Sequence, residues 1–117
     1  MRYMLLIYDE EAKFDALDEA GVGELMGRWG EFHAEIEASG IVSASDRLTP
    51  TNTATTVRRK SGDRVTMDGP FAETKEQLGG YYVIDVKDLD EAIAWAAKCP
   101  SAEDGSVEVR PIWEMEG

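Results

Sequence analysis

The segment spanning residues 68–82 concentrates the ionisable side chains that could carry out chemistry. Asp68 begins an Asp-Gly-Pro turn, and Glu73 and Lys75 follow it shortly before a strongly apolar stretch. A carboxylate that a turn holds within hydrogen-bond reach of a substrate proton can act as a general base. A lysine beside it can bind an anionic group or stabilise an enolate-like charge. We therefore predict Asp68 as a catalytic base, Lys75 as an anion contact, and Glu73 as a residue that positions Lys75 or replaces Asp68 as the base.

Each of these assignments has a structural alternative. Asp-Gly-Pro forms a turn by itself, because Asp bonds the backbone two residues on, Gly permits a positive φ and Pro fixes φ. Acids and lysines on a surface turn are usually solvated. Both interpretations stay open for Asp68, Glu73 and Lys75.

Four further residues are candidates for the same site. His33, the one histidine, lies on the apolar side of a predicted helix, where it is either a buried, hydrogen-bonded residue or a catalytic base. Arg47 is a second anion contact or simply exposed. Tyr3 and Tyr81 lie on the two most apolar segments, so we expect their rings in the core and their hydroxyls at a polar cavity or water. We predict Arg47, Tyr3 and Tyr81 as substrate contacts.

The composition indicates one acidic domain over residues 1–117. Hydrophobic residues make up 43% of the 117, enough for a single core. The net charge of -12 opposes binding to nucleic acid and to anionic membranes, so we expect neither partner. Basic residues gather only at Arg58, Arg59, Lys60 and Arg64, which suit a solvated hairpin edge or an anion-binding patch.

Motifs for metals and cofactors are missing from the sequence. One histidine and one cysteine provide no zinc motif, and there is no P-loop or dinucleotide fingerprint, so we expect no cofactor. The one cysteine also rules out an internal disulfide, and the first apolar run is too short for a signal peptide or a membrane span. We expect a cytoplasmic protein.

The apolar pattern predicts the elements that position these side chains. Segments 2–8 and 81–86 are apolar on both alternating faces and predict central strands. Helical spacing predicts helices over 18–39, with Asp18 as N-cap and Gly40 at C′, and over 88–99, where Pro100 ends the helix. Thr74 and Gln77 have the spacing of a capping box, which predicts a helical turn over 75–78. Further strands are predicted over 41–48, 53–59, 64–67 and 106–115, and a turn at 61–63 joins two of them in a hairpin.

This order of elements predicts an α+β fold of the ferredoxin-like split βαβ type with an inserted β-hairpin. Two helices cover only one face of such a sheet, and the central strands are apolar on the other face too. An uncovered apolar face is uncommon in a stable monomer. We therefore predict a homodimer in which sheet faces sheet about a two-fold axis.

The segment 68–82, DGPFAETKEQLGGYY, resembles the motif of the YCII-related family in its DGPF-domain branch. Segments 3–8 and 105–111 also resemble this branch, so the resemblance covers nearly the whole chain. It implies a dimeric α+β barrel related in fold to muconolactone isomerase and antibiotic-synthesis monooxygenases. Shorter members have a suspected catalytic histidine in the first helix. His33 lies about one turn later than that position, and Trp29 is nearer to it, so the role is not carried over.

Two functions follow from these predictions. The first is a small-molecule-binding protein, as a cofactor-independent enzyme that transfers protons at an Asp/Lys pocket with Asp68 as base. The second is a non-catalytic regulatory or ligand-binding module linked to extracytoplasmic-function sigma factors, because genes of the DGPF branch often lie near genes for such factors.

Overall fold

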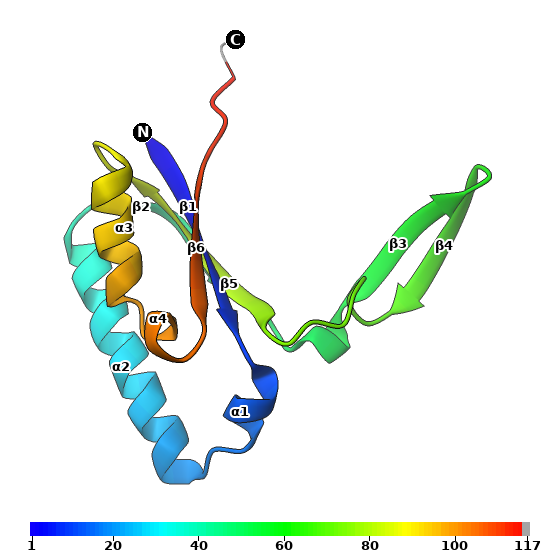
Figure 1. Ribbon diagram of the computed structural model, residues 1–117, viewed down its shortest axis with the longest axis horizontal. Helices are drawn as coiled ribbons and strands as arrows, with labels where there is room; N and C mark the ends of the chain where they lie inside the picture. The colour runs from blue at the N-terminus through cyan, green and yellow to red at the C-terminus, as the bar shows by residue number, and fades with distance from the viewer. Residues whose placement is uncertain (116–117) are drawn as a thin grey trace.

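The structure is a computed structural model that describes residues 1–115, and it contains a four-stranded antiparallel sheet with helices on one face (Figure 1). The sheet order is β2-β5-β1-β6, as in ferredoxin-like folds, and the β3-β4 hairpin is inserted between β2 and β5. The predicted α+β class and the inserted hairpin are confirmed. In chain order the elements are β1 (Arg2–Asp9), α1 (Glu11–Asp15), α2 (Glu19–Ala38), β2 (Val42–Arg47), η1 (Thr51–Thr53), β3 (Thr55–Lys60), β4 (Asp63–Asp68), β5 (Gln77–Asp85), α3 (Leu89–Lys98), α4 (Ser101–Asp104) and β6 (Ser106–Pro111).

The two long helices begin where their capping residues predict. The Asp18 carboxylate accepts a hydrogen bond from the Gly21 amide at 2.8 Å, and Gly40 follows α2 with a φ of 77°. At α3, the Asp88 carboxylate accepts from the Glu91 amide at 3.0 Å, while the Glu91 carboxylate accepts from the Lys87 amide. These bonds satisfy amide groups that a helix start leaves without a partner, which fixes where each helix begins.

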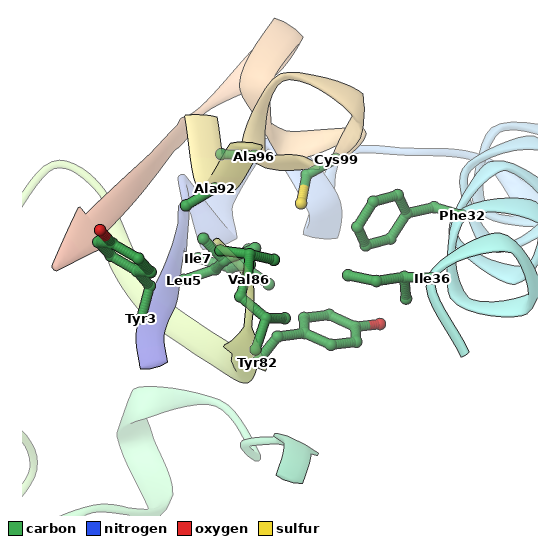
Figure 2. Close-up of a cluster of buried hydrophobic side chains, with 11 residues drawn as sticks. Tyr3, Leu5, Ile7, Phe32, Ile36, Tyr82, Val86, Ala92, Ala96 and Cys99 are labelled. Atoms are coloured by element: carbon green, nitrogen blue, oxygen red, sulfur yellow. The ribbon is translucent and has the colours of Figure 1, made fainter. Parts of the chain in front are cut away.

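The core lies between the sheet and α2, α3 and α4 (Figure 2). Alternate residues of β1 and β5 point toward the helices, and Leu5 and Ile84 are completely buried there. Ile36 of α2 is completely buried against them. The core side chains are Tyr3, Leu5, Ile7, Phe32, Ile36, Tyr82, Ile84, Val86, Ala92, Ala96 and Cys99. Cys99 is a buried free cysteine in this core.

The opposite face of the sheet, which we call the open face, is not covered by any helix of residues 1–115 (Figure 1). Met4, Leu6 and Tyr8 of β1 point to this face and are only half-buried. Arg110 and Glu108 of β6 are the cross-strand neighbours of Met4 and Leu6. The open face therefore has an apolar centre and a charged edge.

The β3-β4 hairpin, which we call the arm, extends away from the sheet and helices (Figure 1). Ser61 and Gly62 have φ values of 52° and 84°, as a tight two-residue hairpin turn requires. The two strands pair with each other in a separate sheet. Val57 and Met67 of the arm are 58% and 56% exposed, so the arm has no apolar core of its own.

Three local predictions were wrong. The helical turn over 75–78 is absent because Gln77 and Leu78 already pair with β1 as the first residues of β5. No helix was predicted between the strand over 2–8 and the helix over 18–39, but this segment contains the short helix α1. The last strand ends at Pro111, which pairs with Tyr3 near the start of β1, and Trp113 beyond it is 91% exposed. Within the described part of the chain, no helix is long and apolar enough to cross a membrane.

Candidate functional site

A cleft of about 1190 Å³ lies between α1, α2 and the ends of strands β1, β2 and β5. Ile7 and Tyr82 form its floor on the sheet, and Met26 and Trp29 form a wall on α2. Most of the lining surface is apolar. A concave, largely apolar site with a few polar groups is the usual form of a small-molecule pocket.

The cleft is open because β5 has two glycines at its floor. Gly80 pairs with Ile7 on one side and with Arg47 on the other, so it occupies a position where a side chain would point toward the helices. A Cβ atom at Gly80 would lie only 2.8 Å from the carbonyl oxygen of Asp46. The glycine therefore allows β2 to pair closely and leaves a gap in the layer of side chains.

A tyrosine and a histidine meet at one end of the cleft. The Tyr82 hydroxyl and His33 Nδ1 are 2.8 Å apart and form a hydrogen bond between β5 and α2. Burial raises the pKa of Tyr82 to about 12, with smaller contributions from Cys99 and Glu37, so the phenol stays protonated near neutral pH. The His33 side chain is 52% exposed, because only one edge of the ring faces Tyr82. The expectation of a buried histidine was wrong, although the expected hydrogen bond exists.

A partly buried carboxylate lies toward the other end of the cleft. Asp9 Oδ2 accepts a hydrogen bond from the Ser101 hydroxyl at 2.6 Å, which joins the end of β1 to the start of α4. Desolvation raises the pKa of Asp9, and the bond from Ser101 only partly offsets this shift; Asp104 and Glu76 add to the rise. Asp9 lies four residues beyond Leu5, the β1 partner of Tyr82. At about 3.3 Å per residue, the Asp9 and Tyr82 positions are roughly 13 Å apart along the sheet.

Arg47 is the cationic side chain at the cleft without an ion pair among residues 1–115. It is exposed at the end of β2, and its guanidinium donates one hydrogen bond within residues 1–115, to the Met26 sulfur at 3.9 Å. The other cations and several acids along the cleft already have partners. These pairs are Arg28 with Glu103 and Asp104, Lys13 with Glu10, Thr51 with Glu11, Tyr81 with Asp46, and Ser101 with Asp9.

Three residues predicted from the sequence border this cleft, namely His33, Arg47 and Tyr81. The prediction of a core position for the Tyr81 ring was wrong, because Tyr81 is only half-buried and pairs with Leu6 of the open face. The Tyr81 hydroxyl donates to Asp46 at 2.6 Å, and this bond raises the pKa of Tyr81. Tyr3 lies in the core at the far end of β1, where its hydroxyl meets the Met1 sulfur at 3.8 Å.

The charged residues of the 68–82 segment lie elsewhere. Asp68 is exposed at the end of β4, and Glu73 and Lys75 are exposed in the loop that leads to β5. None of the three borders the cleft of the single chain. Their catalytic and binding roles remain predictions.

Sequence reasoning missed three residues of the cleft, namely Asp9, Ser101 and Tyr82. A signal was present for Asp9, because it directly follows a strand that is apolar on both faces. The described residues contain no group of three or more His, Cys, Asp or Glu side chains arranged to hold a metal ion.

The topology and the cleft define an α+β protein of the ferredoxin-like type with a candidate small-molecule site at one end of its sheet. Comparison with known families identifies it further. The sequence matches the YCII-related domain over residues 1–116, and the chain belongs to this family. It is 39% identical over 114 residues to an uncharacterized protein of Rhizobium meliloti (strain 1021), and this alignment covers 96% of this chain and 92% of that protein.

Proposed function

We propose that the chain binds a small molecule with an apolar body and an anionic group in the cleft, and acts on it by proton transfer without a cofactor. The observation that carries this proposal is the combination of a largely apolar cleft of about 1190 Å³ with one cation, Arg47, that has no charged partner among residues 1–115. The apolar walls would hold the body of the ligand. Arg47 would bind its anionic group, since a guanidinium fits a carboxylate in two-point geometry.

Asp9 is the base in this proposal. Its desolvated carboxylate has a raised pKa, which makes it a better proton acceptor than a carboxylate in water, and Ser101 holds it in place. The predicted role of Asp68 and Lys75 would need a second copy of the chain to close a cavity over them, because they are exposed in the single chain.

A thermal-shift screen with small aromatic and aliphatic carboxylates tests the proposal. We expect compounds that raise the melting temperature of the wild type and not that of Arg47→Ala. Arg59→Ala is the matched control, because Arg59 lies on the arm and does not border the cleft. If no carboxylate stabilises the wild type, or if both variants respond like the wild type, the proposed site is wrong.

We also propose that the chain is a homodimer whose open faces pack together. Met4, Leu6 and Tyr8 support this, because each is half-buried on a face that no helix covers. Light scattering should give a dimer for the wild type and a monomer for Leu6→Asp. Ile93→Asp, at an exposed apolar residue on α3, should stay dimeric. A monomeric wild type would refute the homodimer.

A regulatory role linked to an extracytoplasmic-function sigma factor is the second candidate. The arm favours it, because its apolar side chains and those of the following loop, such as Phe71 at 77% exposure, have no cover in the single chain. We place either function in the cytoplasm, where the buried free thiol of Cys99 would be stable. A pull-down should retain the cognate sigma factor on the wild type and lose it on Phe71→Ser. Equal amounts on both proteins, or none on the wild type, would refute this role.

A further inference from the structure

The hydrogen bond between Tyr82 and His33 joins a buried phenol to a half-exposed imidazole. Tyr82 is 7% exposed, and its ring packs edge-on against Phe32, with the ring centres 5.6 Å apart. Figure 2 shows the Tyr82 ring directed toward α2, on the side of the core where Ile36 and Phe32 lie. His33 Nδ1 lies 2.8 Å from this hydroxyl, and the His33 side chain is 52% exposed. One ring nitrogen therefore faces the phenol, while the other lies on the solvent side of α2.

A glutamate accompanies the solvent side of the imidazole. Glu37, one helical turn after His33, places Oε1 at 3.8 Å from His33 Nε2. Both side chains are about half-exposed. A carboxylate at this side of the ring favours the tautomer that carries its proton on Nε2, which leaves Nδ1 free to accept a hydrogen bond from the Tyr82 hydroxyl.

We propose that Tyr82 and His33 form a proton relay between the cleft and bulk water, with Glu37 as the positioning residue. The relay depends on the proposed function for its purpose, since the ligand in the cleft would be the partner of the Tyr82 hydroxyl. Its existence can be tested without any ligand.

The steps of the relay balance without an added reactant. A ligand proton moves to the Tyr82 oxygen while the Tyr82 proton moves to His33 Nδ1, and the proton on Nε2 leaves to water. The net result is a deprotonated ligand, an unchanged phenol, an imidazole protonated at Nδ1 in place of Nε2, and one proton in water. The reverse sequence protonates a ligand, and this is the direction that accompanies proton abstraction by Asp9 at the other end of the cleft. The high pKa of the phenol, about 12, suits a group that passes protons on without holding a charge.

A proton relay speeds the exchange of the Tyr82 hydroxyl proton with water, whereas a merely structural hydrogen bond does not. The experiment uses protein labelled with [ζ-13C]tyrosine in an equal mixture of H2O and D2O, in which slow hydroxyl exchange splits the tyrosine signal. Tyr82→Phe assigns the signal. Tyr3 is an internal control in the same spectrum, because it is buried to a similar degree and its hydroxyl contacts only the Met1 sulfur.

We expect one averaged Tyr82 signal in the wild type and a split signal in His33→Gln, whose amide can still bond to the hydroxyl but cannot carry its proton onward. A side chain that transfers protons typically accelerates transfer by about 10²-fold or more, and the exchange rate should fall by about this factor. Glu37→Gln should slow exchange less. His33 is exposed, so the variant should fold, and circular dichroism checks this. Equal Tyr82 exchange rates in folded wild type and His33→Gln would overturn the relay. A failed ligand screen would overturn only the proposed function.

Discussion

Gly80 lies at the floor of the cleft, and the structure predicts a specific loss of stability when a side chain is added there. A Cβ atom there would lie 2.8 Å from the Asp46 carbonyl oxygen and 3.5 Å from the Arg47 Cα atom, both in the backbone of β2. Gly80→Ala must therefore push β2 away from β5, since a backbone atom cannot rotate aside as a flexible side chain can. Overpacking of this kind costs about 1–3 kcal/mol. At about 4 °C per kcal/mol for a chain of this size, the melting temperature should fall by about 4–12 °C.

Gly79 is the matched control for this experiment. A Cβ atom at Gly79 would have its nearest neighbour, the Ile7 carbonyl oxygen, at 4.0 Å, which is an ordinary contact. Neither glycine has a positive φ, so alanine is compatible with the backbone at both positions. Gly79→Ala should change stability by less than about 1 kcal/mol, in either direction. The assay is thermal unfolding at one fixed protein concentration. Equal melting temperatures for the two variants would refute the packing described for β2 and β5.

Three further predictions concern the core and its buried polar groups. Leu5→Ala should destabilise the fold by about 3–5 kcal/mol in urea unfolding, because Leu5 is completely buried, and a loss below about 1 kcal/mol would contradict this core. Burial raises the pKa of Asp9 in the folded state above its value in the unfolded chain. The protonated carboxyl therefore gives its full contribution to the stability of the fold below about pH 4, and this contribution is lost as pH rises through the folded-state pKa. The stability of the wild type relative to Asp9→Asn should therefore fall as pH rises above about 4, and a difference that stays constant or grows would show that Asp9 is not desolvated. Cys99 should react slowly with a thiol reagent in the native state and rapidly in denaturant, because burial raises the pKa of its thiol to about 12, and rapid native labelling would contradict its burial.

The fold could be predicted from the sequence because the residues that begin its helices and form its turns act on their near neighbours in the chain. Asp18 and Asp88 mark helix starts by bonds to amides three residues away, and the turn at Gly62 closes the arm between adjacent strands. The failed prediction of a helical turn has the opposite origin. The partners of Gln77 and Leu78 are on β1, nearly seventy residues earlier in the chain, and a local pattern does not show them.

The candidate site was less accessible for the same reason. Tyr82 and His33 are separated by 49 residues and Asp9 and Ser101 by 92, so only the folded chain brings each pair together. The densest group of ionisable residues in the sequence predicted Asp68 as the base, but the fold places Asp68 on the arm. Arg47 was found because it ends a predicted strand, and strand ends are where the cleft forms.

The three tryptophans allow the most direct test of the cleft as a ligand site. Trp29 lines the cleft, whereas Trp95 packs beneath Lys98 on α3 and Trp113 is 91% exposed near the end of the chain. In protein labelled with 5-fluorotryptophan, single Trp→Phe variants assign the three 19F signals. Titration with small aromatic carboxylates should then shift the Trp29 signal, leave the other two unchanged, and lose its effect in Arg47→Ala. Carboxylates that leave Trp29 unmoved, or that shift only Trp95 or Trp113, would contradict a binding site in the cleft.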